Sequence, residues 1–91
     1  MTAQEFIDYL IAEGTLDKVT DGMKRLGFGV DFVAQNVLSS DRDVTVSHVA
    51  MLWQGMPNKH DRKRTRQLFE LLAEAGLLVP KGDGETWTPK V

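Results

Sequence analysis

The chain has 91 residues, of which 42% are hydrophobic and 26% charged, with no cysteine and a formal net charge of −2. A chain of this length forms one domain whose modest core leaves no room for a deep enclosed active site. The lack of cysteine excludes disulfide bonds and thiolate metal sites. No apolar run approaches the length of a membrane span, and the first residues do not resemble a signal peptide, so we expect a cytoplasmic protein.

The charged residues are distributed unevenly along the chain. Between residues 58 and 66 the sequence holds one acid, Asp61, and five bases, namely Lys59, Arg62, Lys63, Arg64 and Arg66. This segment carries a local charge of +4, so the rest of the chain carries −6. Such a division predicts an acidic body with one basic face.

Residues 4–13 predict a first helix. Its apolar positions recur at helical spacing and form one side, made of Phe6, Ile7, Leu10 and Ile11. Thr2 is the expected N-cap, Glu5 is its capping-box partner, and Gly14 closes the helix.

This first helix has two compatible interpretations. In one it is packed scaffold. In the other, its apolar surface exceeds what one side of a small core absorbs, and Phe6, Tyr9 and Leu10 contribute to a homodimer interface. A second helix is expected to begin at Thr15 or Asp17, with Gly27 and Gly29 closing it.

A third helix is expected to begin at Asp31 and to end within residues 39–41. The β-branched residues 44–46 predict a strand that is too short to stand alone and therefore pairs with later strands. Either Thr45 or Ser47 is the expected N-cap of the next helix. That helix extends to Trp53, where a Gly-Met-Pro break at residues 55–57 follows it.

The longest predicted helix begins at Lys59 and extends toward Gly76. At 100° per residue, four cations share one face of it: Lys59, Arg62, Lys63 and Arg66. A second face, roughly 150° away, is formed by Thr65, Leu68, Leu72 and Ala75. The helix can therefore bury one side while it holds four cations outward near its N-terminus.

Residues 77–80 and 85–88 predict two strands that flank the turn Lys81-Gly82-Asp83-Gly84. We expect Leu78 and Trp87 to pack back on the core. Lys81 is expected at the tip of this hairpin.

The order strand, helix, turn, basic helix and hairpin over residues 44–88 resembles the winged helix-turn-helix superfamily. The resemblance implies a mostly helical α+β fold, in a single domain of residues 1–91. Its helical scaffold covers 1–40, its helix-turn-helix 44–76 and its wing 77–91. The distance from Gly55 to Gly76 is longer than in most of the family, so either the turn is enlarged or the basic helix gains a turn.

The resemblance further implies a sequence-specific regulator of transcription, a repressor or accessory factor that binds double-stranded DNA as a homodimer. The residues expected to contact DNA are Asn58, Lys59, His60, Arg62, Lys63, Arg66 and Lys81, with Thr65 and Gln67 as further hydrogen-bonding groups. The alternative is a winged-helix protein-interaction module, such as a small phage-type inhibitor, whose basic face binds an acidic partner.

We expect no enzymatic activity, metal or other cofactor. His48 and His60 are the only histidines, and no paired acid stands at ligand spacing from them. The glycine pairs at 27–29 and 82–84 lack the context of a phosphate-binding loop, so they indicate turns.

Overall fold

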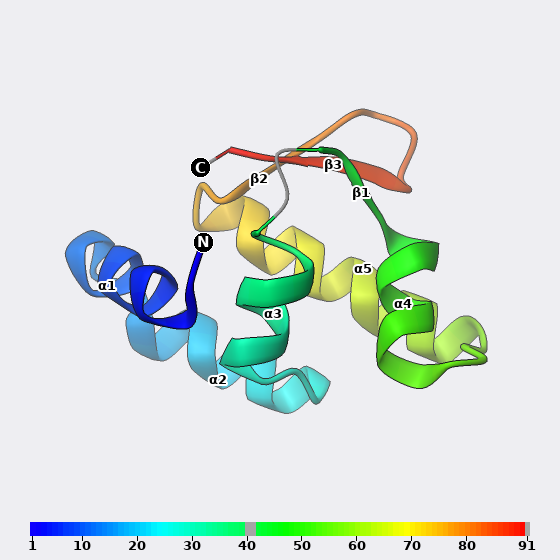
Figure 1. Ribbon diagram of the computed structural model, residues 1–91, viewed down its shortest axis with the longest axis horizontal. Helices are drawn as coiled ribbons and strands as arrows, with labels where there is room; N and C mark the ends of the chain where they lie inside the picture. The colour runs from blue at the N-terminus through cyan, green and yellow to red at the C-terminus, as the bar shows by residue number, and fades with distance from the viewer. Residues whose placement is uncertain (40–41, 91) are drawn as a thin grey trace.

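A computed structural model of the protein describes residues 1–39 and 42–90. Within these residues the chain forms five helices and three short strands (Figure 1). Their bounds are α1 (Ala3–Glu13), α2 (Leu16–Leu26), α3 (Val30–Asn36), β1 (Val44–Thr45), α4 (Val46–Gln54), α5 (Lys59–Glu74), β2 (Leu78–Pro80) and β3 (Thr86–Pro89). The mostly helical α+β class predicted from the sequence is confirmed.

Helix α1 begins and ends as its sequence predicts. The hydroxyl of Thr2 accepts a hydrogen bond from the Glu5 backbone N–H at 3.1 Å, and the Glu5 carboxylate accepts one from the Thr2 N–H at 2.9 Å. This capping box satisfies two backbone donors at the helix N-terminus that would otherwise have no partner. Gly14 ends α1 with a left-handed φ of 71°, which favours glycine.

The boundary between α2 and α3 differs from the prediction at one position. Gly27 ends α2 with a left-handed φ of 89°, but Gly29 has an extended backbone and is the N-cap of α3. Helix α3 therefore begins at Val30, one residue before the expected Asp31. The expected end of this helix falls partly on residues 40 and 41, which lie outside the described residues.

The three strands form one antiparallel sheet in the order β1-β3-β2. Val44 of β1 is opposite Trp87 of β3, and Val79 of β2 is opposite Thr88. Val46, which the sequence placed in the strand, instead begins α4. The cap of α4 is Thr45, whose hydroxyl accepts a hydrogen bond from the His48 backbone N–H at 3.1 Å.

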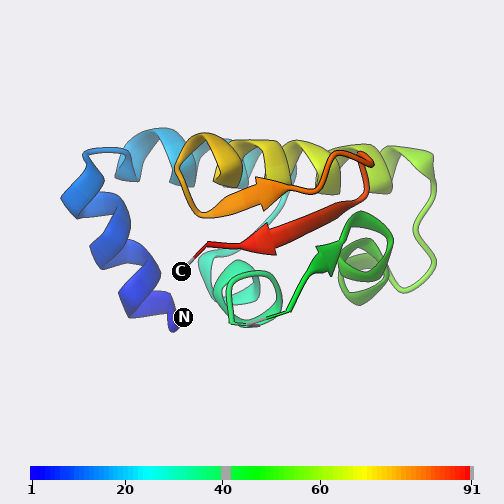
Figure 2. The same cartoon turned by 90° about the horizontal axis from the view of Figure 1, so that it is seen from above.

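Helix α5 runs along the longest axis of the molecule, with α2 beside it and the sheet across its other side (Figures 1 and 2). Gly22 in the middle of α2 leaves room for the Leu71 side chain of α5, because a Cβ there would lie 2.7 Å from a methyl carbon of Leu71. On the sheet side, the ring of Phe69 meets Trp87 edge-on at 5.9 Å between ring centroids. Trp87 and Leu78 are buried, as predicted.

A single core joins the helices to the inner face of the sheet. Its largest fully buried side chains include Phe6 and Leu10 of α1 and Leu68, Phe69 and Leu72 of α5. Among the described residues, we find no helix with both the length and the apolar character needed to cross a membrane.

The turn between β2 and β3 is organised by one carboxylate. Asp83 accepts hydrogen bonds from the backbone N–H groups of Thr86 and Glu85, at 2.7 and 2.9 Å, and from the Thr86 hydroxyl at 2.8 Å. These bonds, with the Thr86 N–H as the largest cause, lower the pKa of Asp83 to about 2. The charged Asp83 carboxylate therefore accepts hydrogen bonds from backbone N–H groups in the turn, and these bonds favour its ionised form.

This geometry predicts an acid-sensitive contribution to stability. The folded-state pKa of Asp83 lies below its ordinary value of 3.8, so its contribution is present above about pH 4 and is lost as the pH falls toward 2. We expect Asp83→Ala to lower the melting temperature at pH 5 and to lose this deficit near pH 2. Thermal unfolding followed by circular dichroism across this range measures the difference, and a deficit that does not change with pH would contradict it.

Candidate nucleic-acid interface

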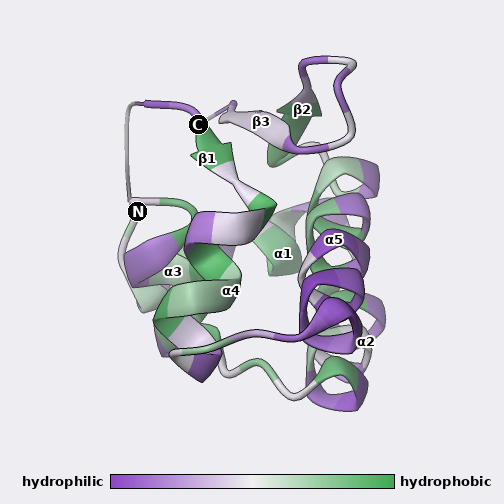
Figure 3. Cartoon of the chain, turned by 90° about the vertical axis from the view of Figure 1, so that its right-hand side faces the viewer, coloured by the Kyte–Doolittle hydropathy of each residue, from purple (hydrophilic) through white to green (hydrophobic). Residues whose placement is uncertain are grey.

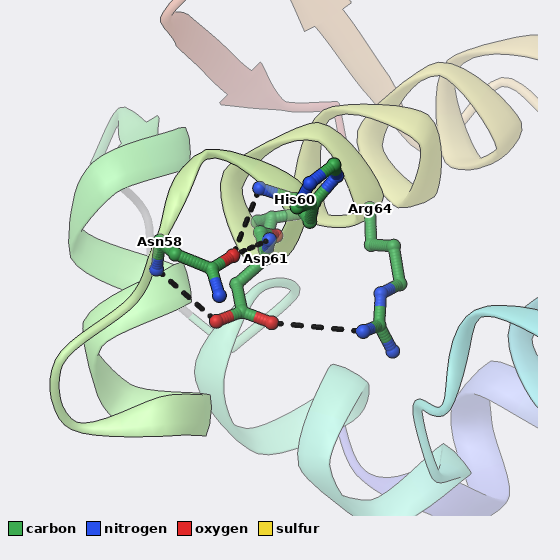
Figure 4. Close-up of polar contacts among 5 residues, drawn as sticks. Asn58, His60, Asp61 and Arg64 are labelled. Carbon is green, nitrogen blue, oxygen red and sulfur yellow. Dashed lines mark hydrogen bonds and ion pairs between the residues drawn. The ribbon is translucent and has the colours of Figure 1, made fainter.

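The start of α5 is held by a reciprocal cap between Asn58 and Asp61 (Figure 4). The side-chain oxygen of Asn58 accepts hydrogen bonds from the backbone N–H groups of His60 and Asp61, both at 2.9 Å. The Asp61 carboxylate in turn accepts one from the Asn58 N–H at 3.1 Å. The sequence assigned Asn58 to base recognition, but its oxygen is occupied by the cap, which leaves only its amide N–H groups as donors.

The cap also settles how the segment from Gly55 to Gly76 is divided. The turn is short, at residues 55–58, and α5 has 16 residues. The additional length predicted from the sequence therefore lies in the helix and not in the turn. Its first residue, Lys59, is fully part of α5.

The predicted helical phase of α5 is confirmed. Four cations are exposed along its outer side: Lys59, Arg62, Lys63 and Arg66. The opposite side is buried and includes Leu68, Phe69 and Leu72. Thr65 belongs to this buried side, where its hydroxyl donates to the Asp61 carbonyl at 2.8 Å, so its expected role in reading bases is wrong.

The exposed cations differ in how firmly the protein holds them. Arg62 donates from Nη1 to the Pro57 carbonyl at 3.2 Å, and Arg66 donates from Nε to the Gly84 carbonyl at 3.0 Å. Within residues 1–39 and 42–90, Lys59 and Lys63 have no hydrogen bond or ion pair, so their ammonium groups are available to an external anion.

Arg64 lies away from this outer side and has a structural role. Its guanidinium is 3.7 Å from the Asp61 carboxylate and 5.3 Å from the centroid of the Trp53 ring. A cation over the face of an aromatic ring is attracted by the ring's quadrupole. Arg64 therefore links the start of α5 to α4.

The hairpin stands beside the cations but adds none at its tip. Lys81, which the sequence placed there, reaches Asp43 at 3.4 Å, and the same carboxylate accepts a hydrogen bond from the Thr88 hydroxyl at 2.7 Å. The turn itself contains Asp83 and is followed by Glu85, whose carboxylate accepts the Ser47 N–H at 2.8 Å. Lys81 is therefore paired within the protein, and its expected contact with an anion stays a prediction.

The positive charge of α5 is confined to its first two turns. Glu70 and Glu74 are exposed further along the helix, and at 100° per residue they fall on the same side as Lys59 and Lys63. Glu74 is also 3.6 Å from Lys18 of α2. An extended anion along α5 would thus be attracted at the N-terminal half and repelled beyond it.

The residues predicted to form a dimer interface are mostly internal. Phe6 and Leu10 are 0% exposed, so they cannot contact a second copy, and that expectation is wrong for both. Tyr9 is half-buried and donates its hydroxyl proton to the Ala75 carbonyl at 2.8 Å. The apolar residue of α1 that does reach the surface is Ile11.

Three exposed apolar side chains near α5 were not singled out from the sequence: Met51, Leu52 and Met56. The first two lie on α4 and the third in the turn before α5. Figure 3 shows hydrophobic colour on α4 beside the hydrophilic first turns of α5. The sequence did contain an indication of this exposed surface, because apolar residues occur on more than one side of α4 in helical projection and only one side can face the core.

The described residues contain no group of three or more histidine, cysteine, aspartate or glutamate side chains placed to hold a metal ion. The candidate interface therefore consists of the cationic start of α5, the neighbouring β2–β3 hairpin and the exposed apolar residues of α4 and the α4–α5 turn. Comparison of the chain with protein families, curated proteins and solved structures finds no significant match.

Proposed function

We propose that this protein is a winged helix-turn-helix regulator of transcription that binds double-stranded DNA through the first two turns of α5. Two features support the fold part of the proposal. The elements follow the order β1, α4, α5, β2, β3, and the sheet order is β1-β3-β2. In this arrangement α5 is the recognition helix and the β2–β3 hairpin is the wing.

The observation that carries the functional part is the set of four exposed cations at the N-terminus of a helix whose other side is buried. The major groove of DNA admits one α-helix, and lysine and arginine there meet phosphates and guanine edges. The positive end of the helix dipole adds to the attraction for phosphate. Binding would occupy an operator, with base contacts restricted to the helix start.

The wing takes a supporting role in this proposal. Its tip is acidic and Lys81 is paired with Asp43, so the tip has little attraction for phosphate. The hydrogen bond from Arg66 to Gly84 instead attaches the wing to the recognition helix. Arg66 therefore has two functions, one electrostatic and one structural.

The test is a duplex-binding titration with matched charge changes. Lys59→Gln combined with Lys63→Gln removes two cations that have no hydrogen bond or ion pair within the described residues. The matched control is Lys18→Gln combined with Lys90→Gln, which removes the same charge at exposed positions away from the start of α5. We expect only the first pair to weaken binding and to reduce the slope of log affinity against log salt by about two.

Fluorescence anisotropy with random duplex at several salt concentrations provides these values. Equal losses in both double variants would show that binding depends on net charge and not on α5. Absence of duplex binding by the unmodified protein at low salt would refute the proposal.

A specific observation favours one alternative function, which is binding of an acidic protein partner. Three apolar side chains are exposed near the cations of α5, namely Met51, Leu52 and Met56. The charged phosphate backbone of duplex DNA offers few partners for apolar side chains. Exposed apolar residues next to charged ones are typical of protein-binding surfaces.

A further inference from the structure

The two ends of the molecule carry different exposed apolar residues. At the end formed by the α4–α5 turn, Met56 is 93% exposed, and Met51 and Leu52 of α4 are about half exposed. Lys59 and Arg62 follow Met56 closely in the chain and are exposed at the same end. We call Met51, Leu52, Met56, Lys59 and Arg62 the basic end.

The opposite end is formed by the turn between α1 and α2. Ile11 is 57% exposed there and borders an open recess that Gly14, Leu16, Asp17 and Lys18 also line. The turn holds two exposed acids, Glu13 and Asp17, and Lys18, which also lines the recess, is 3.6 Å from the carboxylate of Glu74. We call the α1–α2 turn with Ile11, Glu13, Leu16 and Asp17 the acidic end.

These two ends cannot meet within one molecule. The longest dimension of the protein is 34 Å. Figures 1 and 2, in which this axis is horizontal, show the α1–α2 turn at one extreme and the α4–α5 turn at the other. Any contact between them therefore joins two copies of the chain.

The charges of the two ends favour one of the two possible ways in which copies could associate. Pairing two basic ends about a twofold axis would place Lys59 and Arg62 of both copies close together, and like charges at short range are unfavourable. Pairing a basic end with an acidic end places these cations against Glu13 and Asp17 and covers apolar side chains on both copies. The head-to-tail arrangement therefore gains from both electrostatic and hydrophobic contributions.

We propose that this protein associates head to tail, with the basic end of one copy on the acidic end of the next. Met56 enters the recess beside Ile11 and Leu16, a position suited to the flexible methionine side chain. Because the two contacting surfaces differ, the contact is heterologous, and each added copy leaves one end of each kind open. The product is a row of copies whose length increases with concentration. This inference is independent of the proposed DNA binding.

Two variants separate the ends without disturbing the core. Ile11→Lys alters only the acidic end, where it places a cation against the cations of the next copy. Met56→Glu alters only the basic end, where it places an acid against the acids of the next copy, and both positions are exposed. We expect each variant alone to remain at 10.2 kDa. An equimolar mixture has one intact contact left, between the basic end of the first variant and the acidic end of the second. The mixture should therefore form a two-copy complex and nothing longer.

The measurement is sedimentation velocity of the purified full chain, without nucleic acid, over about 20 µM to about 1 mM, because small interfaces associate weakly. The unmodified protein should at least double its weight-average mass across this range and lose the increase in high salt. Val79→Glu is the matched control, since Val79 is an exposed apolar residue on β2 away from both ends, and it should associate normally.

Three results would overturn the head-to-tail contact. These are an unmodified protein that stays at one copy throughout, one that stops at two copies, or a variant mixture that forms no two-copy complex. Circular dichroism spectra of the variants show that they are folded. Since no DNA is present, failure of this association leaves the test of DNA binding unaffected.

Discussion

Phe6→Glu is expected to unfold the protein. The Phe6 ring is completely buried in the core, so a glutamate there loses the apolar contacts of the ring and brings a carboxylate into a site without a partner charge. Substitutions of this kind cost more than about 4 kcal/mol, and the total stability of a domain is roughly 5–15 kcal/mol. Urea denaturation followed by circular dichroism measures the loss.

The matched control is Ile11→Glu in the same helix. Ile11 is mostly exposed, so its substitution should leave the free energy of unfolding within about 0.5 kcal/mol of the original. A folded Phe6→Glu protein with normal stability would show that α1 does not pack as described, and it would restore Phe6 as a surface residue.

Leu72→Ala is expected to reduce the free energy of unfolding by about 2–5 kcal/mol, because it removes buried methyl groups and leaves a cavity. Leu72 is completely buried on the inner side of α5 and belongs to the hydrophobic core. Glu70→Ala is the control, since Glu70 is exposed two positions away and alanine favours the helix. If both substitutions had the same effect in chemical denaturation, the helical phase of α5 would be wrong.

The arrangement of charge on α5 bears on how the protein would meet a duplex. Lys59, Arg62, Lys63 and Arg66 occupy the first two turns, and Glu70 begins the acidic part of the same side. A long DNA segment laid along the whole helix would meet repulsion at its C-terminal half. Entry of the helix start into the groove, at an angle, satisfies the cations and keeps the acids away from phosphate.

Head-to-tail association uses part of the same surface. Lys59 and Arg62 belong both to the basic end and to the proposed DNA face, whereas Lys63 and Arg66 are further along α5. Competition between duplex and a second copy would therefore be expected mainly at Lys59 and Arg62. The acidic α1–α2 turn lies far from the start of α5 (Figure 2), so in the proposed complex it would be directed away from DNA.

Local sequence patterns were sufficient for the parts of this structure that depend on neighbouring residues. Thr2 and Glu5 predicted the start of α1, because a capping box involves only residues three positions apart. The spacing of Leu68 and Leu72 predicted the buried side of α5, since helical geometry alone determines which residues share a face. The glycine-containing turn at 81–84 predicted the hairpin for the same reason.

Only the tertiary structure decided which of these surfaces remain available. Periodicity showed that α1 has an apolar side, but the extent to which α2 and α3 cover it determines that Phe6 is internal and Ile11 external. The position of Lys81 depends on Asp43, 38 residues earlier in the chain, whose carboxylate comes within reach only when β1, β3 and β2 pair. Burial and ion pairing between distant segments are properties of the packed chain, and no local pattern contains them.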